Sequence, residues 1–340
     1  MKKSKKLAFI FLLLLFTLGM SFISLCLGQF KVEINHVVGV IMNGLQLPGP
    51  DFSEADKAIV WFVRLPRVLV ALMVGAALAM SGAVMQGLFG NPLADPGIVG
   101  VSAGASTGAV LAIALGFTSG NMLAMPAFAF VGSLLAVLLT MFLSMRQGKI
   151  PVMTLLLAGV AVGMLLGAIT SGLLTLMNEQ QTQQYLFWMV GGLDFRRWEH
   201  VYLALGPITV GLLLMLLAAR HLNVLVLGET EAKAVGLPVA YYRIGLLLVA
   251  SMTTATSVCV SGNIGFVGLV IPHMLRMLVG ADHRVLLPAS ALGGALFLLV
   301  CDTLGRTLMP PTEIRVGIMT ALLGTPYFLY LLRKLQKTLN

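Results

Sequence analysis

Few residues in this sequence have the types and spacing that could carry chemistry, and most of them are charged side chains beside apolar runs. Asp302 and Arg306 lie four residues apart near the end of one such run, a spacing that lets them pair on a helix face. Charges inside an apolar run are functional candidates by default, because they are costly there. They are too few to form a relay of buried acids. This disfavours an ion-gradient-driven secondary transporter, which stays open as an alternative.

Common motifs of enzymes and metal sites are absent from the sequence. It has no G-x-x-x-x-G-K-[ST] loop for nucleotide phosphates and no H-E-x-x-H motif. Its five histidines are scattered, and its three cysteines stand singly inside apolar runs. We therefore expect no catalytic residue, no metal site, no bound cofactor and no ATP hydrolysis by this chain alone. A structural or enzymatic membrane scaffold is the third class of function left open.

The composition predicts an integral membrane protein. Of the 340 residues, 58% are hydrophobic and only 10% are charged, against about 25% charged in a soluble domain. We expect an all-α fold with one polytopic transmembrane domain over residues 1–340 and no nucleic-acid partner. Apolar runs of about membrane length predict ten spans: Leu7–Phe30, Arg67–Gln86, Gly97–Leu115, Met122–Met145, Pro151–Met177, His200–Ala219, Tyr241–Val260, Gly265–Val279, Val285–Leu308 and Ile314–Leu332.

The basic residues predict the orientation of the chain in the membrane. The net charge is +9, and the lysines and arginines gather at the ends of the apolar runs. Lysines at positions 2, 3, 5 and 6 precede the first run, which is long for a cleaved signal and predicts a retained helix. With ten spans and the basic end inside, most lysines and arginines fall on the inside. Both termini are therefore expected in the cytoplasm.

A short polar segment, residues 87–97, separates two apolar runs; we call it the elbow. Gly87 and Gly90 weaken a helix there, and Asp95 followed by Pro96 is a helix start signal. We expect two membrane-length helices joined at this point, with protein or a water-filled cavity shielding the irregular backbone. Two glycine ladders spaced by four predict close helix packing: Gly100, Gly104 and Gly108, and Gly159, Gly163 and Gly167.

The longest connection on the predicted inner side covers residues 222–241. Its part Leu227–Pro238 predicts a short helix, with acidic residues in the first turn and Gly236 and Pro238 at its end. Taken alone, this pattern is equally typical of a solvated loop helix and of a docking segment.

Several motifs together resemble the FecCD-type permease subunits of bacterial ABC importers for iron–siderophores, haem and cobalamin. The resemblance runs from Arg64 to the C-terminus and rests on Arg64–Arg67, Ser81–Gln86, Asn91–Gly97 with Gly100, Leu156–Ala161, Trp188–Gly192, Gly265–Arg276, and Asp282–Arg284 with Leu287–Pro288. It implies the type II importer fold in the bacterial cytoplasmic membrane, as a homodimer. It also implies two cytoplasmic ATP-binding subunits, which hold ATP and magnesium, and an extracytoplasmic substrate-binding protein.

The resemblance also implies roles for particular residues. Arg64, Arg67 and Arg306 match outward arginines that meet glutamates of the binding protein, and we expect them at an exposed rim; interfacial snorkelling is the alternative. Asn91 and Leu93 match an inner gate. The coupling segment would engage the ATPase through Gly228, Glu229, Glu231, Ala232 and Gly236. A ferric siderophore is the first expectation for the cargo, haem the second and cobalamin the third.

Overall fold

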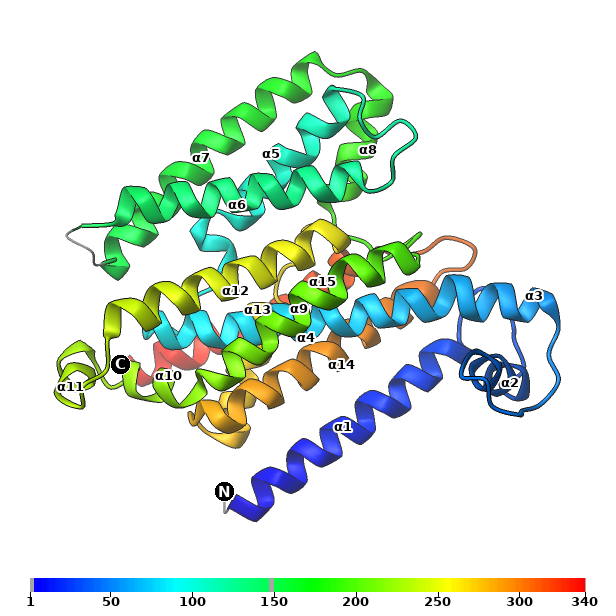
Figure 1. The fold of residues 1–340 in the computed structure, drawn as a ribbon, viewed down its shortest axis with the longest axis horizontal. Coiled ribbons are helices and arrows are strands. Elements are labelled where there is room, and N and C mark those ends of the chain that lie inside the picture. Colours follow the sequence, from blue (N-terminus) through cyan, green and yellow to red (C-terminus); the bar gives the residue numbers. More distant parts are fainter. Residues whose placement is uncertain (1–2, 147–149, 340) are drawn as a thin grey trace.

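The computed structural model, which describes residues 3–146 and 150–339, is an all-α bundle (Figure 1). Among these residues, seven helices are long and apolar enough to cross a membrane: α1 (Lys3–Cys26), α4 (Leu65–Phe89), α6 (Ala124–Ser144), α7 (Val152–Leu176), α9 (Trp198–Leu217), α12 (Val239–Ser261) and α14 (His283–Thr307). Three helices have shorter apolar stretches: α5 (Val101–Ala114), α13 (Val267–Val279) and α15 (Val316–Leu339), in which the stretch is Val316–Tyr330. Together they occupy the ten predicted spans.

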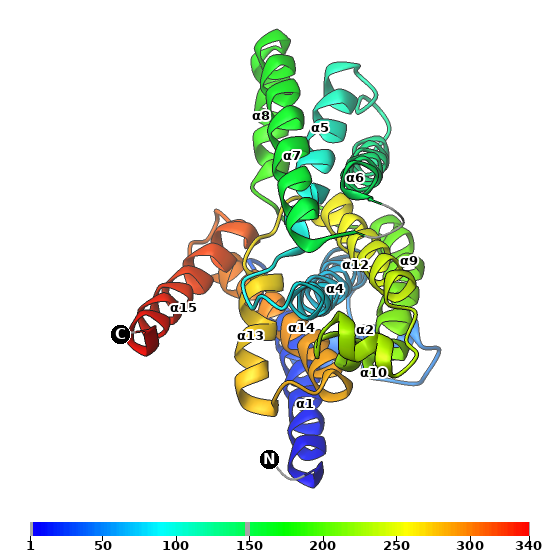
Figure 2. The ribbon, with the colours of Figure 1, turned by 90° about the vertical axis from the view of Figure 1, so that its left-hand side faces the viewer.

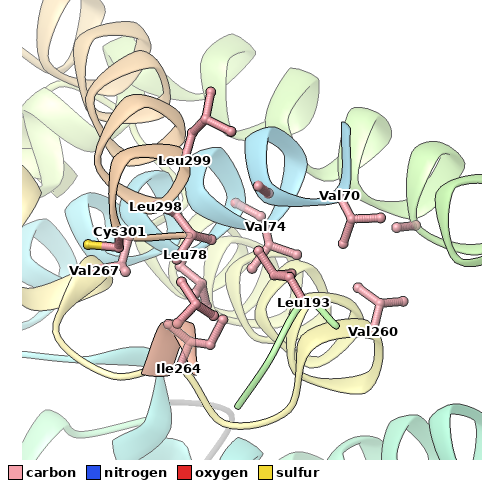
Figure 3. Close-up of a cluster of buried hydrophobic side chains, with 14 of the residues drawn as sticks. Val70, Val74, Leu78, Leu193, Val260, Ile264, Val267, Leu298, Leu299 and Cys301 are labelled. Atoms are coloured by element: carbon pink, nitrogen blue, oxygen red, sulfur yellow. The ribbon is translucent and has the colours of Figure 1, made fainter. Parts of the chain in front are cut away.

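Helix α4 lies at the centre of the larger group of helices, surrounded by α9, α12, α13 and α14 (Figure 2). Small residues let these backbones meet. A Cβ atom on Gly75 would overlap the carbonyl oxygen of Gly294, and one on Gly82 would overlap that of Gly268. Around these contacts Val74 and Leu78 of α4 pack with Leu298 of α14 (Figure 3). Close backbone approach is the main route to stability in lipid, where burying an apolar side chain gains little.

Helices α5, α6 and α7 form a second group, drawn above the first in Figure 1. The first glycine ladder faces α6, as the close-packing prediction requires. A Cβ atom on Gly104 would overlap the carbonyl oxygen of Gly132, and one on Gly108 would overlap that of Phe128. The second ladder behaves differently. Gly159 packs against the carbonyl oxygen of Ile98, but Gly163 and Gly167 face open space in the single chain.

Short helices gather at the two ends of the bundle (Figure 1). One end, here called the α11 side, carries α10 (Ala219–Leu225) and α11 (Glu229–Ala234) near the start of α1. The opposite end, the α2 side, carries α2 (Ile34–Gly44), α3 (Glu54–Lys57) and η1 (Ala58–Arg64). A further short helix, α8 (Glu179–Met189), follows α7 at the end of the second group.

The structure corrects several predicted boundaries. The elbow does not lead directly into a membrane-length helix: the 3₁₀ turn η2 (Pro96–Val99) and Gly100 precede α5, which has only 14 residues. The span predicted from Arg67 is continuous with η1 and α3. Residues 179–189 form one helix whose start is capped by Asn178, and Trp188 in its last turn is buried in the protein. Part of the predicted inner loop is the helix α10.

Candidate functional site

The first candidate region is a buried cluster of charges on the α2 side. Arg67 donates from Nε and Nη2 to Asp302, at 2.8–3.1 Å, and from Nη1 to Glu313 at 2.8 Å. Arg67 Nη2 also lies 3.5 Å from Asp194. The predicted pair is confirmed, since Arg306 Nε lies 3.2 Å from Asp302 Oδ2. Helices α4 and α14 and two loops are thus joined by ion pairs that sequence spacing could not reveal, except for the pair four residues apart.

The three arginines of the predicted rim are almost completely covered, so the expectation that they are exposed is wrong. Their exposed fractions are 4% for Arg64, 8% for Arg67 and 4% for Arg306. Arg64 donates to the carbonyl oxygens of Leu25, Cys26 and Phe30, which closes the end of α1. The cause is local: carbonyls at a helix end lack partners, and a guanidinium has five donors to offer. The role of Arg64, Arg67 and Arg306 in docking the binding protein stays a prediction.

Beside Arg67 a pocket of about 470 Å³ opens on the α2 side. Arg196, Arg197 and Glu313 line it together with the apolar side chains of Phe62 and Phe195. Burial lowers the pKa of Arg196 to about 10, although Asp194 acts in the opposite direction, so this guanidinium stays charged at neutral pH. The pocket therefore has mainly apolar walls that carry a few charged groups, three arginines and two carboxylates.

The elbow lies between α4 and α5, and its turns are closed by its own side chains. Asn91 Oδ1 accepts from the Leu93 amide at 2.9 Å, and Asp95 Oδ1 accepts from the Gly97 amide at 2.8 Å. The prediction that Asp95 caps a helical start is confirmed, but the helix is η2. Gly100 follows with φ +93°, a conformation that favours glycine and separates η2 from α5. Asn91 is exposed and Leu93 is half-buried.

A polar contact that the sequence analysis missed joins the start of α5 to the loop before α13. Ser102 Oγ donates to Asn263 Oδ1 at 3.1 Å, and both Asn263 and Gly265 are exposed in the single chain. Both α5 and α13 are too short to cross the hydrocarbon core, since 14 residues span about 21 Å. Irregular backbone at membrane depth is tolerated where protein covers it or where it lines a water-filled cavity. In the sequence, the run Gly262-Asn263-Ile264-Gly265 was the signal that could have indicated this irregular backbone.

The last candidate region is α11 with its flanking turns. Gly228 precedes the helix, and Glu229 in its first turn accepts from Lys233 at 2.7 Å and from Arg243 at 3.3 Å. The hydrogen bond from Lys233, with the two cations, holds the pKa of Glu229 below its usual range. Ala232 is buried and Glu231 is exposed.

The helix ends as the sequence predicts. The Leu237 amide donates to Ala232 O and the Gly236 amide to Lys233 O, with Gly236 at φ +79°. A pocket of about 430 Å³ lies at its base, lined by Glu229, Pro238 and Arg243 among others. The segment is therefore a defined projection beside a concave surface, the form expected of a docking element.

Comparison with known proteins fits this arrangement of a membrane bundle with short helices at both ends. The family model described as the FecCD transport family matches residues 13–334. This chain belongs to the FecCD transport family. It is 45% identical over 308 residues to the cobalamin import system permease protein BtuC of Halobacterium salinarum, covering 88% of this chain and 82% of that protein. It is 47% identical over 277 residues to the hemin transport system permease protein HmuU of Yersinia pestis, covering 80% and 83%.

A solved inward-facing conformation of a metal-chelate type ABC transporter has the same fold. Its TM-score to this FecCD chain is 0.85, with 34% identity, covering 96% of this chain and 99% of the other. The chain is thus a multi-span permease subunit of an ABC importer in the inner membrane. Permeases of this family work with an ATPase and a binding protein, so the energy for transport comes from another subunit.

Proposed function

We propose that this permease moves a metal chelate across the cytoplasmic membrane: a ferric siderophore, haem or cobalamin. The observation that carries this proposal is the placement of α11, which projects from the same end of the bundle at which α4 enters the elbow. Closure of an ATPase pair against α11 would then act close to the elbow that carries Asn91 and Leu93. Relatives named for cobalamin and for hemin support a large metal chelate as the cargo class.

The orientation follows from the same proposal. The α11 side faces the cytoplasm, with both termini, and the two ATP-binding subunits dock there through Glu229, Glu231 and Ala232, with Gly228 and Gly236 shaping the segment. ATP and magnesium belong to those subunits. The α2 side faces out, where the binding protein docks. A carboxylate of that protein would enter the pocket beside Arg67 and Arg197, while Arg64 and Arg306 hold its walls in place.

The permease works as a homodimer in this proposal. Helix α7 supports it, because only 17% of its most apolar window is buried in the single chain. Gly163 and Gly167 on this helix have no neighbour within 4 Å, so another helix could approach closely there. The passage would then run between the two copies, with the Ser102–Asn263 contact and the elbow on its wall.

The mechanism is alternating access without bond-making chemistry by this chain. ATP binding closes the ATPase pair, the two α11 segments move with it, and one mouth of the passage opens while the other closes. The cargo slides along a wall of small, methionine and weakly polar residues. Such a wall suits transport, because a passage that binds tightly does not release its cargo.

The test is uptake into proteoliposomes that contain the permease with candidate ATPase and binding-protein partners. A radiolabelled ferric siderophore, haem and cobalamin are supplied in parallel, each with and without ATP. ATP-dependent accumulation of one cargo, dependent on the binding protein, supports the proposal and names the cargo. Accumulation that follows a proton or sodium gradient and ignores ATP would instead make this chain a secondary transporter.

A further inference from the structure

A three-residue junction connects the segment beside α11 to the loop between α13 and α14. Asn223 lies on α10, and its Nδ2 donates to Asp282 Oδ1 at 2.7 Å. Asn223 Oδ1 accepts from the His283 amide at 2.9 Å and lies 2.7 Å from His283 Nδ1. One amide side chain therefore contacts the cap and the first residue of α14, because Asp282 also accepts from the Arg284 amide at 3.1 Å.

The donors and acceptors around Asn223 fix the orientation of its side-chain amide. A carboxylate cannot donate, so the amide nitrogen of Asn223 must face Asp282 and its oxygen must face His283. The ring nitrogen Nδ1 of His283 then carries the hydrogen. Only a side chain with one donor and one acceptor at this distance satisfies both neighbours, which makes asparagine specific for the position.

The junction continues to the elbow through direct packing. A Cβ atom on Gly87, in the last turn of α4, would lie 2.9 Å from His283 Nε2 and 3.2 Å from the side chain of Leu222. Leu222 is the neighbour of Asn223 on α10 and is completely buried. The end of α4 is thus held between α10 and the start of α14, and Gly87 is also the first residue of the elbow.

We propose that Asn223 is a positioning residue that links movement of the α10–α11 segment to the elbow, by holding α10 and the start of α14 as one body against Gly87. This inference rests on the proposed function, because it assigns a role in ATP-driven movement. It concerns a residue outside α11 and outside the elbow.

The test is a donor–acceptor swap. Asn223→Asp sets two carboxylates against each other across 2.7 Å, which like charges disfavour. Asp282→Asn alone leaves an acceptor for Asn223 and for the Arg284 amide, so its effect is expected to be smaller. In the double variant Asn223→Asp/Asp282→Asn, the amide introduced at position 282 donates to the carboxylate introduced at position 223. Asp282 Oδ1 accepts both bonds in the parent, so the new amide turns until its nitrogen faces position 223 and its oxygen faces the Arg284 amide, and asparagine is an equally good helix cap. Asn43→Asp, at an exposed position of α2 at the opposite end of the bundle, makes the same substitution without meeting Asp282 and is the matched control.

Two readouts separate this inference from the proposed function. The first is cargo imported per ATP hydrolysed in the reconstituted complex. The second is the ATP-induced change in the maleimide labelling rate of Asn91→Cys, in a background without the native cysteines; it needs no cargo. We expect Asn223→Asp to reduce both by about tenfold, within the range typical of coupling between sites. The swap restores both to within about threefold of the parent, and Asn43→Asp changes neither.

The inference is overturned if Asn223→Asp keeps the parent import ratio and the parent labelling response, or if the swap stays as defective as Asn223→Asp. It is also overturned if ATP does not alter elbow labelling in the parent complex. Failure of the proposed function looks different, because the parent complex then imports none of the three cargoes with ATP.

Discussion

Replacing Asp302 by asparagine tests the buried charge cluster most directly. Asp302 is 1% exposed, receives three hydrogen bonds from Arg67, and lies 3.2 Å from Arg306 Nε. Without this carboxylate, Arg67 still has Glu313 and Asp194. Among the described residues, Arg306 keeps only neutral hydrogen-bond partners, Ser24 and the carbonyl oxygen of Leu27, and Glu313 acts on it from beyond ion-pair distance.

The expected loss of stability depends on how many buried charges are left without an ion-pair partner. Removing one partner of a buried pair costs about 3–5 kcal/mol when the remaining charge has no compensation. Without Asp302, Arg306 has no ion-pair partner among the described residues, whereas Arg67 keeps two. We therefore expect Asp302→Asn to destabilise the subunit by about 3–5 kcal/mol. Each 1.4 kcal/mol is about tenfold, so the unfolding equilibrium should shift by roughly 10²- to 10⁴-fold.

The assay is denaturant unfolding of the purified permease in detergent micelles, monitored by tryptophan fluorescence. Glu313→Gln is the matched control, because Glu313 also pairs with Arg67 at 2.8 Å but its side chain is 26% exposed. A partly exposed pair contributes about 0–1 kcal/mol. The double variant Asp302→Asn/Arg306→Gln removes the stranded cation and should recover part of the loss. The reasoning is refuted if Asp302→Asn is no more destabilising than Glu313→Gln, or if the double variant is no more stable than Asp302→Asn alone.

The remaining predictions concern helix packing and the coupling segment. Gly104→Leu should reduce the yield of folded subunit, because the new side chain would collide with the Gly132 backbone. Gly163→Leu should leave the fold intact and weaken the dimer. Size-exclusion chromatography with light scattering measures both the yield of folded subunit and the dimer. Glu231→Arg should abolish ATP-dependent uptake without loss of folded protein, while Glu54→Arg on the α2 side should not; equal losses would contradict the coupling role. Gly236→Ala should cost about 1–2 kcal/mol at its left-handed backbone, seen as faster proteolysis near α11; unchanged cleavage would argue against a structured turn.

The sequence by itself determined that this is a membrane protein, where its spans lie along the chain, and where short-range caps, turns and ion pairs form. Apolar runs of about twenty residues can only cross a lipid core as helices, because every backbone group there needs an internal partner. The cap at Asp95, the stop at Gly236 and the pairing of Asp302 with Arg306 depend on neighbours within four residues, and the structure has all three.

Tertiary structure alone decided how distant residues meet. Arg67 and Asp302 are 235 positions apart, and their pairing buries an arginine that sequence reasoning expected at an exposed rim. The same holds for the glycine ladders, since Gly104 meets α6 while Gly163, with identical spacing, faces open space. Spacing fixes which residues share a helix face, but only the packing of whole helices fixes what that face meets, and the junction at Asn223 exists for that reason.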